Sequence, residues 1–458
     1  MAQGELRRSV LPNGLRVLGV ENPSLHSFVC SVYVRVGPRF EPPERAGLSH
    51  FLEHMVLQGS ERFPDSATIL RGIEDVGGVV DAATYEEHMR FVFAVHRKHW
   101  RRVLEIAGDV LLRPLFDPGE LEREKLIIAQ EVSQHRDRAG RNISPEEIAH
   151  CLLFHGRASE SGTRGSPAIM SRFDRALIEA HYRRFFVPGN MVVCLAGGLH
   201  FDEVLDELAE RMGALAPAAE TPPEPLPVAA RPTARARAFC RPTEALPVAE
   251  LLLSHRACGL RDERFDALRA ASYLLGGGLS SRLFMRVREE LGLVYQIDSH
   301  VQSYSDTGAF EMFLSVGVEN LTAAFEAGLE VLHETLRDGF TAEELDRYKE
   351  SLRCGMDMLC DQPTHLADWF GRQELLLGAD GVVTPADHVG RNEALTLGDL
   401  RAVLRDVCTP DRSDLVCVGP YGSAEREGLM SAFDADAVAA VSGDDEPEAT
   451  APVPMGSV

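Results

Sequence analysis

The residues of this chain best suited to chemistry lie in one short run, His50-Phe51-Leu52-Glu53-His54. Side chains four residues apart share one face of a helix, so His50 and His54 can present both imidazoles to one point. Two imidazoles aimed at one point form a metal-binding pair. Glu53 lies beside them, close enough to take a proton from a water molecule held by the ion. The run therefore predicts a zinc site with its own base.

The competing interpretation is an amphipathic helix with two surface histidines. The H-x-x-E-H pattern arises by accident in on the order of one chain in a hundred of this length. A third ligand would favour the metal site, because catalytic zinc usually takes three protein ligands and leaves one position open. Glu124 and Glu131 are candidates, since both face one side of a helix that the Asp117-Pro118 signal opens. An isolated glutamate on a helix is more often solvated than bound to metal.

The elements that must position this run are short strands and capped helices. Asn13-Gly14 predicts a hairpin turn, and residues 27–36 predict a buried strand that leads toward the histidine helix. Residues 79–85 and 91–95 predict two further strands. A strand beside the metal helix could bind an extended peptide by adding it to the sheet edge, although an ordinary core hairpin is equally compatible with this stretch.

The same pattern of elements returns in the second half of the chain. Residues 214–237 are rich in Pro, Ala and Glu and predict an extended linker. Beyond it, the capped helix start at Thr341 echoes that at Asp117, which predicts a second copy of one α+β unit. Tyr348 and Gly355 stand where Glu124 and Glu131 stood, so we expect only the first copy to bind metal. The expected domains are 1–213, the linker 214–237, 238–439, and a disordered acidic tail 440–458.

Composition excludes several classes of protein. The chain has 458 residues, 45% of them hydrophobic, and a formal charge of −23, which argues against nucleic acid as a partner. It has no apolar run long enough for a membrane span and no secretory signal, so we expect no membrane association and a cytoplasmic location. Nine cysteines without a C-x-x-C pair suit reduced thiols. Whether the acidic charge lines an interior that attracts cationic peptides stays open at this stage.

The motif and its distant glutamates resemble the pitrilysin and insulinase family of zinc peptidases, which are inverzincins. Size and layout are similar to the branch that contains the mitochondrial processing peptidase and its bacterial relatives. The resemblance implies that His50, His54 and Glu131 bind one Zn²⁺ per chain, with Glu53 as general base and Glu124 as a supporting carboxylate.

Further site residues follow only from the resemblance. Family members carry an Arg and a Tyr matched here by Arg288 and Tyr295, which are implied to approach the zinc site and bind the peptide carbonyl or the oxyanion. Without the resemblance, Arg288 would belong to a solvated helix face. Asp81, Ala82 and Thr84 are expected to bind the substrate strand. The sequence departs from the family at Asp81, where Asn is usual, and at Gln130, where Glu is common.

The resemblance implies an α+β fold of two homologous domains, each a mostly antiparallel sheet with helices on one side, arranged like a clamshell. The implied activity is zinc-dependent endopeptidase hydrolysis of unstructured or presequence-like peptides, by a zinc-activated water with Glu53 as base. Because this chain holds both the zinc motif and the Arg/Tyr pair, we expect a homodimer, with a heterodimer as the alternative. Two other functions stay open: a catalytically silent or processing-partner subunit, and a specialised peptide-maturation protease.

Overall fold

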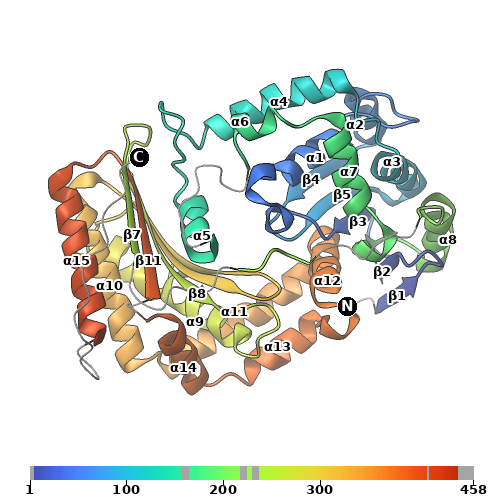
Figure 1. The fold of residues 1–458 in the computed structure, drawn as a ribbon. Helices are drawn as coiled ribbons and strands as arrows, with labels where there is room; N and C mark the ends of the chain where they lie inside the picture. The colour runs from blue at the N-terminus through green and yellow to red at the C-terminus, as the bar shows by residue number, and fades with distance from the viewer. Residues whose placement is uncertain (1–4, 156–163, 217–223, 229–236, 410–411, 442–458) are drawn as a thin grey trace.

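The computed structural model describes residues 5–155, 164–216, 224–228, 237–409 and 412–441. Two sheets, each with its own layer of helices, stand on either side of the molecule (Figure 1). The expected α+β architecture of two related halves is confirmed. Most of the expected linker (217–223 and 229–236) and of the tail (442–458) lies outside the described residues, and 224–228 has no regular secondary structure.

The N-terminal sheet is antiparallel except for one pair of strands. Its order is β1-β2-β6-β3-β5-β4, and only β2 and β6 run parallel. The Asn13-Gly14 turn joins β1 to β2, and Gly14 adopts a φ of 94° that a glycine tolerates without strain. The strands are β1 (Leu6–Val10), β2 (Arg16–Glu21), β3 (Ser27–Val34), β4 (Val79–Thr84), β5 (Met89–His96) and β6 (Met191–Gly197).

Helix α1 (Leu48–Val56) is held by one apolar stripe. Leu48, Phe51, Leu52, Met55 and Val56 follow the spacing of a single helical face, and all are fully buried in the core of the N-terminal half. This burial turns the two histidines and Glu53 away from the core. The other helices of this half are α2 (Ser66–Glu74), α3 (Trp100–Leu112), α4 (Pro118–Ser133), α5 (Pro145–His155), α6 (Pro167–Met170), α7 (Arg175–Phe185) and α8 (Phe201–Met212).

The C-terminal sheet repeats this topology in five strands and has no counterpart of β1. Its order is β7-β11-β8-β10-β9, again with one parallel pair, β7 and β11. Its strands are β7 (Arg237–Pro242), β8 (Ala249–Ala257), β9 (Gln296–Ser303), β10 (Gly308–Val316) and β11 (Ser413–Gly419). Its helices are α9 (Phe265–Gly276), α10 (Leu321–Asp338), α11 (Ala342–Cys360), α12 (Pro363–Leu377), α13 (Pro385–Glu393), α14 (Leu397–Val407) and α15 (Ser423–Val441), with a wide helical turn, η5 (Phe284–Glu290), before β9.

One element begins later than the sequence pattern indicated. The apolar residues Leu293 and Val294 are typical of a strand over 293–297, but β9 begins at Gln296 and continues to Ser303. Val294 instead packs in the C-terminal core, and pairing with β10 sets the limits of the strand. None of the described helices is long and apolar enough to cross a lipid bilayer.

Each half lends one helix to the sheet of the other half. Helix α5 of the first half packs on β8 and β11, whereas α12 of the second half packs on β3 and β6 (Figure 1). Gly371 permits the close approach of α12, because a Cβ there would lie 2.2 Å from the ring of Tyr33. Each sheet is therefore covered on its second face by a helix from the opposite half, in addition to its own helical layer.

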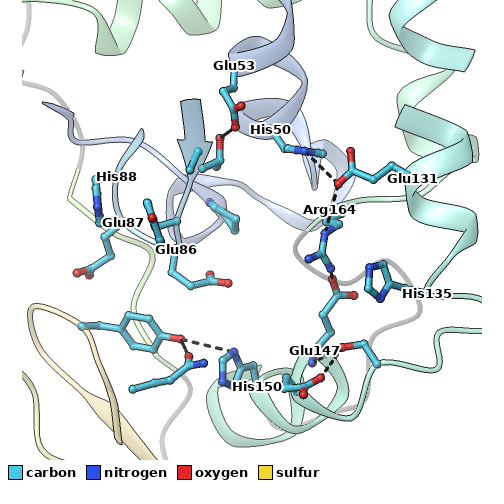
Figure 2. A pocket seen from close by; sticks show the side chains of 18 of the residues that line it. His50, Glu53, Glu86, Glu87, His88, Glu131, His135, Glu147, His150 and Arg164 are labelled. Carbon is cyan, nitrogen blue, oxygen red and sulfur yellow. Dashed lines mark hydrogen bonds and ion pairs between the residues drawn. The ribbon is translucent and has the colours of Figure 1, made fainter. Parts of the chain in front are cut away.

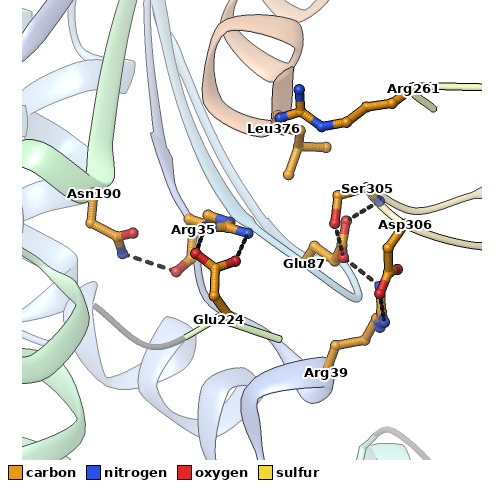
Figure 3. A network of polar contacts seen from close by, with 9 residues as sticks. All are labelled: Arg35, Arg39, Glu87, Asn190, Glu224, Arg261, Ser305, Asp306 and Leu376. Atoms are coloured by element: carbon orange, nitrogen blue, oxygen red, sulfur yellow. Dashed lines mark hydrogen bonds and ion pairs between the residues drawn. The ribbon is translucent and has the colours of Figure 1, made fainter. Parts of the chain in front are cut away.

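The two halves also meet where the β4–β5 and β9–β10 turns face each other. Glu87 accepts hydrogen bonds from the amide and the hydroxyl of Ser305, at 2.7 and 2.8 Å. Arg39 bridges Glu87 (2.5 Å) and Asp306 (2.7 Å), as Figure 3 shows. Arg39 and Glu87 are almost fully buried, so this network fixes the spacing of the halves at one edge.

Candidate active site

Three side chains from α1 and α4 converge on one point. Ligand atoms of His50, His54 and Glu131 all lie within 4.8 Å of one another. The carboxylate of Glu131 is 3.6 Å from Nε2 of His50 and 3.8 Å from Nε2 of His54. Two imidazole nitrogens and a carboxylate form the donor set that catalytic zinc uses, and the spacing suits a single ion. The described part of the chain holds this one group that could bind a metal.

A second carboxylate orients one of the two imidazoles. Glu124 lies in the buried stripe of α4, and its Oε2 is 3.0 Å from Nδ1 of His54. A contact at Nδ1 leaves Nε2 of His54 for a metal, which is the usual role of a carboxylate behind a metal-binding histidine. Glu124, which the resemblance implies to be a supporting carboxylate, thus lies behind the ring of His54. Nδ1 of His50 is buried and has no hydrogen-bond partner among the described residues.

The base candidate is held by the neighbouring strand. The hydroxyl of Thr84 in β4 donates a 2.7 Å hydrogen bond to Glu53. Burial raises the pKa of Glu53, and the hydrogen bond from Thr84 opposes that rise. A carboxyl with a raised pKa is a better proton acceptor near neutral pH than an exposed one.

The two histidines differ in their electrostatic surroundings. Burial, with the nearby His54 and Arg164, lowers the pKa of His50 to about 4, so its ring is neutral at pH 7. Burial acts to lower the pKa of His54 as well, but the hydrogen bond to Glu124 and the surrounding carboxylates outweigh it and raise that pKa. A metal ion binds the neutral form of both imidazoles.

These groups open into a cavity of about 1060 Å³ between the two halves. Among the described residues that line it, seven are glutamate and only two are arginine, Arg164 and Arg372. Figure 2 shows Glu53, His50 and Glu131 on one side and Glu86, Glu87 and His150 facing them. Part of the strong negative charge of the chain thus lines an interior. Besides Glu53 and Glu131, the lining glutamates are Glu86, Glu87, Glu146, Glu147 and Glu250.

The structure brings only some of the expected substrate residues to this cavity. Ala82 and Thr84 line it, whereas Asp81 is not among the lining residues and pairs with Arg90 at 3.2 Å. Arg288 and Tyr295 are also absent from the lining. Tyr295 is 78% exposed, and the Arg288 guanidinium lies over its ring. Within one chain, the pair does not meet the metal-binding group.

Sequence reasoning missed two residues that support the site. The buried carboxylate of Glu41 accepts hydrogen bonds from the amides of Gly47 (2.7 Å) and Ser49 (2.5 Å), and so caps the first turn of α1. Arg164 reaches the cavity beside Glu131. Glu41 contacts α1 across a loop, and Arg164 comes from a segment far along the chain. Neither residue belongs to a recognisable local sequence pattern. A glycine directly before α1 was the local sequence signal of a constrained helix start. In the structure, Gly47 has a φ of 88°, in the left-handed region.

Comparison with known proteins identifies the family. The model described as Insulinase (Peptidase family M16) matches residues 16–153, and the one described as Peptidase M16 inactive domain matches residues 172–352. The chain belongs to peptidase family M16. The inactive-domain match falls mainly on the second half, where Tyr348 and Gly355 replace the glutamates.

Relatives of similar length support this assignment. The uncharacterized zinc protease YmxG of Bacillus subtilis is 26% identical over 91% of this chain and 99% of its own length. An uncharacterized zinc protease of Streptomyces coelicolor is 28% identical over 94% of this chain and 93% of its own. A protease from Helicobacter pylori shares the fold, with a TM-score of 0.83 and 19% identity over 92% of this chain and all of its own. The M16 peptidase architecture therefore spans nearly the whole chain.

Proposed function

We propose that this M16 chain is a zinc metalloendopeptidase that cleaves unstructured, basic peptides inside the cavity between its halves. The observation that carries the proposal is the complete set of functional groups: two imidazoles and a carboxylate within 4.8 Å, with Glu53 beside them. A relative that had lost activity would be free to lose any of these groups.

The roles of the chain's residues follow from their positions. His50, His54 and Glu131 would hold one zinc ion, which supplies polarisation of the scissile carbonyl and acidifies the attacking water. Glu53 accepts the proton of that water and passes it to the leaving amine. Thr84 fixes the rotamer of Glu53, and Glu124 fixes the ring of His54.

The size and charge of the cavity define the substrate class. Among its described lining residues are seven glutamates, which favour peptides that carry Lys and Arg, and a space of about 1060 Å³ is too small for a folded domain and so favours chains without folded structure. β4 is the outermost strand of its sheet, so its free edge can pair with an extended peptide next to α1. Ala82 and Thr84 would then face the bound strand.

We further propose a homodimer in which the partner copy supplies Arg288 and Tyr295. Around η5, Leu279, Met285 and Leu291 are exposed together with Tyr295, an apolar set that a partner would cover. Leu126 is similarly exposed on α4, the helix that carries Glu131. Joining the two surfaces would bring the Arg/Tyr pair of one copy to the metal site of the other, where the pair can stabilise the negative charge of the transition state.

The test is cleavage of a quenched, unstructured, Arg-rich peptide by the wild-type chain and by Glu53→Gln, with metal content measured on both. We expect about one zinc ion in each and turnover in the wild type only. Turnover by Glu53→Gln at the wild-type rate would exclude Glu53 as the base. A chain that binds neither zinc nor peptide would instead support the silent-subunit alternative.

A further inference from the structure

Arg164 is one of two arginines among the described residues that line the cavity with seven glutamates, and it lies beside the metal-binding group. Its Nη1 donates a 2.7 Å hydrogen bond to Glu147, and its Nε is 3.7 Å from Oε1 of Glu131. Figure 2 shows the guanidinium between these two carboxylates. The same Oε1 is the atom that faces Nε2 of His50 at 3.6 Å. Arg164 therefore contacts the one metal-binding carboxylate of the site.

The backbone of Arg164 is fixed against the start of the metal helix. A Cβ on Gly47 would lie 2.4 Å from the carbonyl oxygen of Arg164, and a Cβ on Gly165 would lie 2.2 Å from the carbonyl oxygen of Ala46. Both glycines have positive φ, 88° and 77°. Arg136 adds a 3.1 Å hydrogen bond to the Gly165 carbonyl. The two segments thus touch backbone to backbone, at a distance that any side chain would prevent.

We propose that Arg164 is a positioning residue that orients Glu131 for metal binding, as Glu124 orients His54. Metal-binding carboxylates are usually held by an outer hydrogen-bond or ion-pair partner, and losing such a partner typically costs 10- to 100-fold in metal affinity or activity. Among the described residues, Arg164 is the cation in ion-pair contact with Glu131. This role of Arg164 rests on the metal site of the proposed function. It adds to that site a residue outside the run from His50 to His54.

A cation near a metal ion also repels it, so the two effects must be separated. Arg164 is already paired with Glu147, and the pair as a whole adds little net charge at the position of the ion. Removing Arg164 alone would leave the largely buried Glu147 without this cation and make the cavity more negative. Arg164→Met combined with Glu147→Gln removes the pair at constant net charge. This double variant therefore tests the orientation of Glu131 separately from the electrostatic field at the metal position.

The decisive measurement is zinc affinity of the full chain by competition with a chromophoric chelator. We expect about tenfold weaker binding in Arg164→Met and in Arg164→Met/Glu147→Gln. Arg172→Met, which removes an exposed arginine outside the cavity, should bind as the wild type does. Arg164→Lys should be intermediate, because an ammonium group cannot span both carboxylates. The visible absorption of the Co²⁺-loaded chains should also change in the Arg164 variants and not in Arg172→Met.

Wild-type zinc affinity in the charge-neutral double variant would overturn the proposal, even if Arg164→Met alone binds more weakly. Melting temperatures of the metal-free chains separate misfolding from altered binding. Because affinity is measured without substrate, a wild type that binds zinc but cleaves no peptide contradicts only the endopeptidase assignment. A wild type that binds no zinc contradicts the metal site itself.

Discussion

The hydroxyl of Thr84 donates a 2.7 Å hydrogen bond to the carboxylate of Glu53, and so ties the edge strand β4 to the metal helix α1. In the proposed function, peptide binding along β4 and proton transfer by Glu53 therefore share one residue. We expect Thr84→Val to lower kcat about tenfold with little change in KM, because a freely rotating general base loses much of its advantage. Steady-state kinetics of the wild type and of Thr84→Val give both constants. Thr84→Ser keeps the hydroxyl and should stay near wild type; equal losses in both variants would contradict the role.

Glu124 should control metal affinity rather than catalysis alone. Glu124→Gln places an amide against Nδ1 of His54 where a carboxylate now accepts, and we expect zinc to bind 10- to 100-fold more weakly. Chelator competition gives the affinity. Glu122→Gln, an exposed change on the same helix, is the matched control. An unchanged affinity in Glu124→Gln would remove Glu124 from the site.

The acidic cavity predicts that substrate charge governs KM. Raising the ionic strength should increase KM for an Arg-rich peptide several-fold and change KM little for a neutral one, since salt screens charge attraction beyond about 10 Å at 0.1 M. Glu250→Gln should raise KM for the basic peptide, whereas Glu210→Gln on the outer surface of α8 should not. The same salt response for both peptides would contradict the electrostatic account.

A buried ion-pair network should make the docking of α5 depend on pH. Glu311 is fully buried between His300 (3.1 Å) and His150 (3.6 Å). Burial acts to raise the pKa of Glu311, but the two histidines outweigh it and hold that pKa well below its ordinary value. Burial likewise opposes the charge on His300, but Asp298 and Glu311 raise its pKa to about 10.

The pKa shifts of Glu311 and His300 stabilise the protein over different pH ranges. The lowered pKa of Glu311 gives stability that is present above pH 4.5 and is lost in acid, whereas the raised pKa of His300 gives stability that is full below pH 6.5 and is lost toward pH 10. Glu311→Gln should therefore destabilise most near pH 6, by roughly 3 kcal/mol. The melting temperatures at pH 6 and at pH 10.5 should differ less in Glu311→Gln than in the wild type. An equal difference in the two proteins would contradict the contribution of this network to stability.

The sequence alone was sufficient where short-range patterns decide the structure. The apolar stripe from Leu48 to Val56 fixes which face of α1 is buried, and the Asp117 cap fixes where α4 begins, so the pairing of His50 with His54 and the start of α4 could be predicted. The repeat was visible because capping signals recur at Thr341. Comparison with a family added Glu131 and the fold of both halves.

The rest depends on contacts between segments far apart in the chain. Arg164 reaches Glu131 only because Gly47 and Gly165 allow two backbones to touch, and no periodicity encodes such a meeting. The acidic cavity collects glutamates from both halves, each of which looks like ordinary surface charge in the sequence. The position of Tyr295 away from the cavity of its own chain likewise follows from how β9 is placed in its sheet.

The exchange of α5 and α12 between the halves bears on how such a chain can evolve. Among the described residues only the first half holds a group that could bind a metal, yet the second half provides α12, which covers the strands behind that group. Deleting α12 would expose Leu18, Val29 and Val192 to water. Each half thus completes the core of its neighbour, and we expect that neither half alone is a stable protein.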